Sequence, residues 1–324
     1  MNVVIEKHTN RISAIDQFRG LAIVLMVAAN FMGGISKLPS WLKHAPDVGL
    51  TAVDLIAPFF IFAIGLTYRI SFNRRAFSKG MYDTVFHFII RFLAIVGIGA
   101  VFSAGAAFAG ESGGDWGVLQ AIGAAGLICL VFIRTSILVR LASGLGILAA
   151  YQILLDRLWL NDIIKSTHGG LPGSLGWGAM LILSTVLADL YHDAKHRGFH
   201  YVSASVVILV SGIASSLFIP VSKHRVSMSY VLICVGISAL LFFLFTLFQG
   251  KMGRFLAPLT WWGRNPLFLY ILHQMLLGVI VLPEIAGWYS EAPVWLSACQ
   301  LLCLLGVISW IAWFLYKKKI VISL

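Results

Sequence analysis

Charged side chains are scarce in this sequence, where Asp, Glu, Lys and Arg make up 11% of 324 residues. Soluble globular domains carry about 25% charged residues, so the composition excludes an ordinary soluble enzyme. Hydrophobic residues reach 59%, enough for about ten helices of roughly 20 apolar residues each. The remaining residues are too few for a separate soluble domain. The sequence therefore predicts an all-α polytopic membrane bundle, with a single domain over 1–324.

Cysteine is also rare, and its placement indicates neither a disulfide framework nor a zinc site. The cysteines all fall within apolar runs, at Cys129, Cys234, Cys299 and Cys303. Histidines repeat every four residues at His192, His196 and His200. This short, highly charged segment is more typical of a solvated helix beside the membrane than of a metal site. We therefore expect no metal cofactor.

Apolar runs bounded by polar turns predict the membrane-spanning helices. They lie at 14–34, 50–70, 85–109, 116–133, 136–155, 175–190, 200–219, 226–248, 264–282 and 294–316. The first run carries Asp16 and Arg19 and lacks a small-residue cleavage site. We therefore expect it to remain as the first span rather than to be removed as a signal peptide.

Acidic residues are few beside the basic ones, with 13 Asp and Glu against 24 Lys and Arg. When both termini are placed inside, 18 of the 24 basic residues fall on the inner face and six on the outer face. The positive-inside rule predicts this asymmetry for an even number of spans. The net charge of +11 therefore indicates orientation in a lipid bilayer with anionic headgroups, not nucleic-acid binding.

Two long outer loops, 35–49 and 156–174, contain several glycines and prolines. Irregular backbone near a membrane face is tolerated where it is buried in protein or lines a cavity. We therefore expect these loops to form the walls of an outer pocket.

An acidic residue inside the second apolar run, Asp54, is the clearest polar candidate. An ionisable group in hydrocarbon costs at least about 2.5 kcal/mol, so it marks either a functional site or a buried pair or cap. His44 lies ten residues earlier, and the segment 46–49 can fold back to bring the two together. A carboxylate on one ring nitrogen would fix the tautomer and leave the other nitrogen as a base.

Other polar groups enter the first span. Asn30 lies near its outer end, where an amide could donate to a developing oxyanion or simply bond a neighbouring helix. Asp16 and Arg19 are three residues apart, so we expect an ion pair at the inner end. Gly20 follows directly and would allow backbone or a ligand to approach closely.

A late segment also carries polar groups at helical spacing. Asn265 and His273 are eight residues apart and would share a helix face, with Tyr270 between them. Such a stripe either lines a pocket or bonds neighbouring helices, and the sequence leaves both readings open.

Two classes of function fit these features. A transporter would carry polar groups near the midplane, often on a pair of broken helices. An enzyme would gather a base and an acceptor site at one face, as Asn30, His44 and Asp54 suggest. The polar residues favour the enzyme, with a secondary transporter or exporter of a small solute or envelope precursor as the alternative.

A resemblance then narrows the enzyme class. The Asp16-x-x-Arg19-Gly20 element, Asn30, the His44-Ala45 pair, and Gly49-Leu-Thr-Ala-Val-Asp54-Leu-Ile-Ala-Pro58 resemble the heparan-α-glucosaminide N-acetyltransferase family of transmembrane acyltransferases. About 60 residues resemble the family well, and the segment 263–273 resembles it more loosely. The chain looks like a bacterial plasma-membrane member.

The resemblance implies acetyl transfer from acetyl-CoA to an amino sugar or other glycan at the extracytoplasmic face. It places the family's catalytic histidine on His44 and its other functional residues on Asn30 and Asp54. The family usually has Trp three residues after the histidine, whereas this chain has Asp47, so the acceptor could differ. We expect the substrate pocket to include Asp47, Asn265, Tyr270 and His273.

Coenzyme A would enter from the cytoplasmic side, where its phosphates need cationic partners. The inner-face candidates are Arg19, Arg69, Arg74, Arg75 and Arg264. Each of them also fits a role in topology and lipid contact. The sequence leaves open the acceptor, N- against O-acetylation, a covalent acetyl-histidine, and the oligomeric state, including a homodimer.

Overall fold

The computed structural model describes residues 2–108, 116–193, 198–253, 255–283 and 285–322, and within them the fold is entirely helical. Its longer helices are α1 (Asn2–Gly33), α2 (Ile56–Lys79), α3 (Met81–Phe108), α4 (Val118–Phe132), α5 (Ile137–Leu154), α7 (Gly170–His192), α8 (Phe199–Ser215), α9 (Met228–Met252), α10 (Ala257–Arg264), α11 (Pro266–Val281) and α12 (Val294–Lys317). Short helical turns are η1 (Ser40–Leu42), η2 (Ala52–Leu55), η3 (Leu155–Trp159), α6 (Leu160–Ile163) and η4 (Thr167–Gly169). The predicted all-α class is therefore confirmed.

The helices have the length and composition of a multi-pass membrane protein. Among the described residues, seven helices are long and apolar enough to cross a bilayer. A further pair, α10 and α11, passes the same test together but bends by 87° at the break between them. The two remaining predicted spans correspond to the shorter apolar helices α4 and α8. Each predicted range thus coincides with an apolar helix, while the number that cross the bilayer and the orientation stay predictions.

One loop prediction was wrong in extent. The segment 156–174 is largely helical, because η3 and α6 extend α5 and α7 already begins at Gly170. Leu155 and Ile163 are buried, so apolar packing continues the helix beyond the predicted end of the span at 155. The expected irregular backbone is limited to a short turn around His168 and Gly169, both of which have positive φ. The outer loop is therefore shorter than the sequence indicated.

The described residues gather into two compact units. Unit 1 comprises 1–44, 51–60 and 241–323, and unit 2 comprises 45–50, 61–240 and 324. The helices α2 and α9 contribute residues to both units, because the boundaries at 60 and 240 fall inside them. The expectation of one domain over 1–324 stays a prediction.

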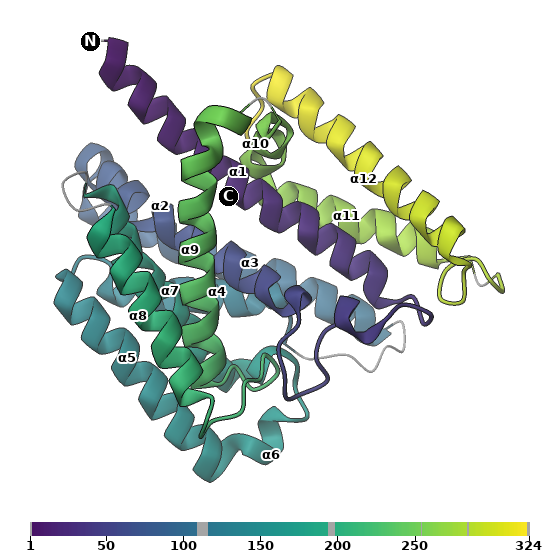
Figure 1. Cartoon of the computed structure of the whole chain (residues 1–324), viewed down its shortest axis with the longest axis horizontal. Helices are drawn as coiled ribbons and strands as arrows, with labels where there is room; N and C mark the ends of the chain where they lie inside the picture. Colours follow the sequence, from purple (N-terminus) through teal and green to yellow (C-terminus); the bar gives the residue numbers. More distant parts are fainter. Residues whose placement is uncertain (1, 109–115, 194–197, 254, 284, 323–324) are drawn as a thin grey trace. The chain divides into compact units, whose positions relative to one another are not determined.

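In unit 1, α1 packs along α10 and also contacts α11 and α12 (Figure 1). Phe18 lies at the centre of an aromatic cluster, with ring centroids 5.7 Å from Phe59 and 5.5 Å from Phe242. Two glycines make the crossing of α1 and α10 close. A Cβ on Gly20 would lie 1.9 Å from the carbonyl oxygen of Leu259, and one on Gly263 would lie 1.8 Å from that of Asp16. The close approach expected at Gly20 is thus made by the backbone of α10.

In unit 2, α7 is the central helix, and it packs against α4, α5 and α8 (Figure 1). Of its membrane-length window, 83% is buried, whereas only 22% of the corresponding window of α3 is buried. A helix buried on all sides needs small residues where its neighbours cross. Gly65 of α2 meets Ser184 of α7 in this way, since a Cβ there would lie 2.5 Å from the Ser184 Cβ. Unit 2 therefore has a helical core centred on the buried α7, with α3 left largely exposed.

Candidate active site

The segment before α2 is organised by a capping box. Thr51 is the N-cap of η2, and its backbone N–H donates to Asp54 Oδ2 at 2.9 Å. The Thr51 hydroxyl lies 3.0 Å from the same oxygen and 2.9 Å from the carbonyl oxygen of Lys43. A Thr three residues before a carboxylate is the usual signature of this cap. The cap therefore positions the Asp54 carboxylate and ties the preceding chain to it.

The capping box brings His44 against Asp54. His44 Nδ1 lies 2.8 Å from Asp54 Oδ1, so the predicted fold-back of the segment 46–49 is found. The Asp54 side chain is fully buried, whereas 49% of the His44 side chain is exposed. An ionised carboxylate only accepts hydrogen bonds, so Nδ1 carries the proton and Nε2 is the basic nitrogen. This arrangement can accept a proton from a substrate or attack a carbonyl carbon.

Asn30 is held by the late span. Its amide nitrogen lies 3.0 Å from Nε2 of His273, a fully buried residue of α11. The Tyr270 ring packs edge-on against His273 with centroids 5.0 Å apart, and Gln274 Nε2 donates to the Tyr270 hydroxyl at 3.1 Å. The sequence placed Asn30 and His273 in separate parts of the site. The structure joins them in one interhelical contact within unit 1.

Asn265 has a different partner from His273. It lies at the break between α10 and α11, where its amide nitrogen donates to the Ile320 carbonyl oxygen at 3.0 Å. Its carbonyl oxygen accepts from the Ile322 N–H at 2.7 Å. Both ends of this buried carboxamide therefore bind the segment after α12. The polar stripe was expected either to line a pocket or to bond neighbouring helices. Asn265 has a bonding role, and its partner is the segment that follows α12.

The inner end of unit 1 carries two of the candidate arginines. Arg19 forms the expected pair with Asp16 at 3.2 Å, and the same nitrogen lies 3.3 Å from the Gly263 carbonyl oxygen. Arg264 is exposed and stacks on the Tyr316 ring, with its guanidinium carbon 4.6 Å from the ring centroid. Both side chains thus lie near the crossing of α1 with α10 and α12.

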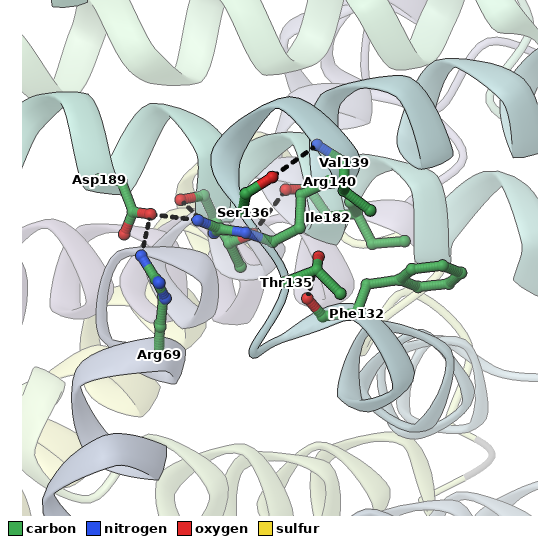
Figure 2. A network of polar contacts seen from close by, with 9 residues as sticks. Arg69, Phe132, Thr135, Ser136, Val139, Arg140, Ile182 and Asp189 are labelled. Atoms are coloured by element: carbon green, nitrogen blue, oxygen red, sulfur yellow. Dashed lines mark hydrogen bonds and ion pairs between the residues drawn. The ribbon is translucent and has the colours of Figure 1, made fainter.

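The other candidate arginines belong to unit 2, and one of them is in a buried network. Arg69 and Arg140 both bind the carboxylate of Asp189 (Figure 2). Arg140 is fully buried, and it also donates to the carbonyl and hydroxyl oxygens of Thr185 at 3.1 and 3.0 Å. A charge pair at this depth makes Arg69 part of the packing of α2, α5 and α7. Arg74 is exposed, and Arg75 is partly buried.

Asp47 is in an ion pair with Arg225. Arg225 Nε donates to both Asp47 oxygens, at 2.8 and 3.1 Å, and its Nη2 also binds the carboxylate. The Ser222 hydroxyl donates to Asp47 Oδ1 at 2.9 Å. The hydrogen bond from Arg225 holds the pKa of the Asp47 carboxyl below its usual range and raises the pKa of Arg225. The segment around Asp47 is thereby joined to the connection between α8 and α9.

The structure describes two of the three repeated histidines, His192 and His200. His192 Nε2 lies 3.0 Å from the Leu66 carbonyl oxygen, whereas His196 lies outside the described residues. Lys195, Arg197 and Arg254, three of the 18 basic residues assigned to the inner face, lie outside the described residues as well. Within the described part of the chain, no group of three or more His, Cys, Asp or Glu side chains is placed to hold a metal ion.

Sequence reasoning missed three residues that organise these contacts. Thr51 had a recognisable signal, since it stands three residues before Asp54 at the start of a helix. Arg140 had a weaker one, as an arginine inside the apolar run 136–155. Arg225 gave no local signal, because its partner Asp47 is 178 residues away.

Comparisons with known proteins place the His44–Asp54 pair in a known family. Residues 11–168, just under half of the chain, match the sequence model of the heparan-α-glucosaminide N-acetyltransferase catalytic region. Residues 11–168 belong to this family. The heparan-α-glucosaminide N-acetyltransferases of Mus musculus and Homo sapiens are 47% and 45% identical to this chain over 57 and 56 residues.

The acetyltransferase match has a defined extent. The aligned stretch covers 17% of this chain and 8% of the length of each of these relatives. The matched region 11–168 includes Asn30, His44 and Asp54. The late-span residues Asn265, Tyr270 and His273 lie outside it, so the structure alone links His273 to the acetyltransferase-like segment.

Proposed function

We propose that this chain is a membrane acetyltransferase that transfers the acetyl group of acetyl-CoA to an amino sugar or other glycan acceptor at the extracytoplasmic face of a bacterial plasma membrane. The observation that carries the proposal is the 2.8 Å contact between His44 Nδ1 and the buried Asp54 carboxylate. It lies within the segment that matches an acetyltransferase family. A base held in one tautomer by a buried carboxylate, with half of its ring exposed, suits proton transfer from an external acceptor.

In the proposed mechanism His44 is the general base. The proton of the acceptor amine or hydroxyl passes to Nε2 while the acceptor nitrogen or oxygen bonds to the thioester carbonyl carbon. The carbon–sulfur bond then breaks, and the proton returns from the imidazolium to the coenzyme A sulfur, which leaves as the thiol. Asp54 holds the ring and stabilises its positive charge during the step. A covalent acetyl-histidine would use the same nitrogen as a nucleophile.

Asn30 is the proposed oxyanion donor. A carboxamide nitrogen carries two hydrogens, and the contact with His273 uses one of them. The second can point to the thioester oxygen, where one such donor contributes typically about 10²–10³-fold to turnover. We assign His273 to positioning, because its bond to Asn30 fixes the direction of the amide.

The donor phosphates would bind on the inner face. Arg264 in unit 1 and Arg74 in unit 2 are the strongest candidates, each considered by itself, since each is exposed and the charge distribution predicts it at a cytoplasmic helix end. Arg19 and Arg264 are both close enough to Asp16 in unit 1 for their charges to act on it, so Arg19 can add its charge to the same site. Arg69 is the weakest candidate, because it is already paired with Asp189, which Arg140 also binds.

Acetyl transfer can be tested on detergent-purified protein with labelled acetyl-CoA and glucosamine, or a hydroxylated glycan, as acceptor. We expect labelled product, and we expect acetyl-CoA to raise the melting temperature, because a ligand that binds only the folded state stabilises it. Arg264→Gln and Arg74→Gln should weaken that shift, with Arg157→Gln on the opposite face as the matched control. Neither product nor a melting shift at saturating acetyl-CoA would overturn the proposal and favour the transporter, for which the broken pair α10–α11 is the supporting feature.

A further inference from the structure

A hollow of about 430 Å³ lies at the junction of α2 and α3. Arg75 and Lys79 line it from the last turns of α2. Asp83, Phe86, His87 and Ile90 line it from the first turns of α3. Gly80 joins the two helices with a φ of +84°, a conformation that glycine adopts without strain. All of these residues belong to unit 2.

The lining is cationic at one end and apolar at the other. Arg75 and Lys79 outweigh the single carboxylate of Asp83, which leaves a net charge of +1 when His87 is neutral. Arg91, one helical turn beyond His87, is near enough for its charge to act on that ring. The Nε of Arg75 is buried without a hydrogen-bond partner among the described residues. The site therefore offers a positive potential and an unused donor to an anion.

The apolar end opens on an exposed surface of α3, a helix long and apolar enough to cross a bilayer, so we expect this surface to face lipid. Phe86 is 56% exposed and Ile90 is 51% exposed, on a helix with little buried surface. Tyr82 stacks on Phe86 and is also exposed, as interfacial aromatic residues are. A second hollow, lined only by apolar side chains of α3 and α4, lies on the adjoining face of α3. A ligand that fills both ends therefore has an anionic head and a hydrocarbon chain.

We propose that the α2–α3 hollow binds an anionic phospholipid, with the phosphate on Arg75 and Lys79 and an acyl chain along Phe86 and Ile90. Basic pockets on the cytoplasmic side of membrane helices are typical sites for such headgroups. Coenzyme A also presents phosphates, but it has no long hydrocarbon chain for the apolar end. Arg75 is thereby assigned to lipid rather than to the acyl donor, and the assignment is independent of acetyl transfer.

Native mass spectrometry of the purified protein tests the site, with phosphatidylglycerol and phosphatidylcholine of identical acyl chains as probes. Each basic contact near a membrane surface contributes about 1 kcal/mol, which is roughly fivefold in affinity. Arg75→Gln and Lys79→Gln should each weaken phosphatidylglycerol binding about fivefold, and the double variant about 30-fold. Asp83→Asn should strengthen it, because the variant removes the opposing carboxylate.

Arg74→Gln is the matched control, since Arg74 neighbours Arg75 on the same helix but does not line the hollow. Its binding should stay near that of the wild type. The proposal is overturned if phosphatidylglycerol binds no tighter than phosphatidylcholine, or if Arg74→Gln weakens binding as much as Arg75→Gln. Displacement of the bound lipid by acetyl-CoA would instead identify the hollow as a donor site. Weaker binding by Asp83→Asn would also contradict the charge argument.

Discussion

Replacing His44 by Ala separates a catalytic role from a structural one. Half of the His44 side chain is exposed, and its bond to Asp54 is one of several contacts that hold this carboxylate. The variant leaves Asp54 with the N–H and hydroxyl of Thr51, so the loss of stability should not exceed about 1–3 kcal/mol. Turnover should fall by about two to four orders of magnitude, the range for loss of one positioned base.

Replacing Asp54 by Asn tests whether the carboxylate acts through the histidine. The carboxylate accepts from both His44 Nδ1 and the Thr51 N–H. An amide has only one acceptor oxygen, so Asp54→Asn must lose one of these bonds or turn its N–H₂ against a donor. We expect lower turnover from the misoriented ring. The double variant His44→Ala, Asp54→Asn should be no slower than His44→Ala alone, because residues acting as a unit are not additive.

The assay for these variants is single-turnover acetyl transfer from labelled acetyl-CoA, with acetyl-CoA melting shifts measured in parallel. His224→Ala is the matched control, since His224 is another loop histidine that bonds only a backbone carbonyl among its described contacts. The reasoning is refuted if His44→Ala turns over like the wild type, or if Asp54→Asn lowers turnover further when His44 is already absent. Loss of the melting shift in His44→Ala would show that the variant damages binding rather than chemistry.

Three further predictions concern topology, packing and pH. Single cysteines introduced at positions 43 and 74 should react differently with an impermeant thiol reagent on intact cells, and we expect labelling at 43 only. Labelling at 74 only would show the opposite orientation. Gly20→Ala should destabilise the detergent-solubilised protein by about 1–3 kcal/mol through overlap with α10, whereas Gly97→Ala, which meets no atom within 4 Å, should not. The lowered pKa of Asp47 means that its ion pair stabilises the protein above the ordinary Asp pKa of about 3.9 and loses this effect as pH falls through the lower folded value. The free energy of unfolding should differ between wild type and Asp47→Asn by about 0.2–1 kcal/mol at neutral pH, and this difference should vanish in acid. A difference that does not change with pH would contradict the charge pair.

Local features of this protein were readable from the sequence. The apolar runs located each long helix, because a backbone surrounded by apolar side chains must satisfy its hydrogen bonds within the same segment. The pair Asp16–Arg19 followed from helical spacing, and the contact between His44 and Asp54 from a short loop of ten residues. Helix ends were less predictable. The segment after Leu155 continues as helix because its apolar side chains pack into unit 2. The local sequence gave no signal for this continuation.

Partners far apart in the chain were decided only by tertiary packing. Asn30 finds His273 across 243 residues, and Asp47 finds Arg225 across 178. Hydropathy identifies an apolar helix, but it does not indicate which other helix packs against each of its faces. In a membrane-length helix nearly every face is apolar, so small residues such as Gly20 and buried polar groups select the crossing partners. The sequence alone therefore determined the helices and the His44–Asp54 pair, while the packing of those helices determined what holds Asn30 and which arginines stay exposed.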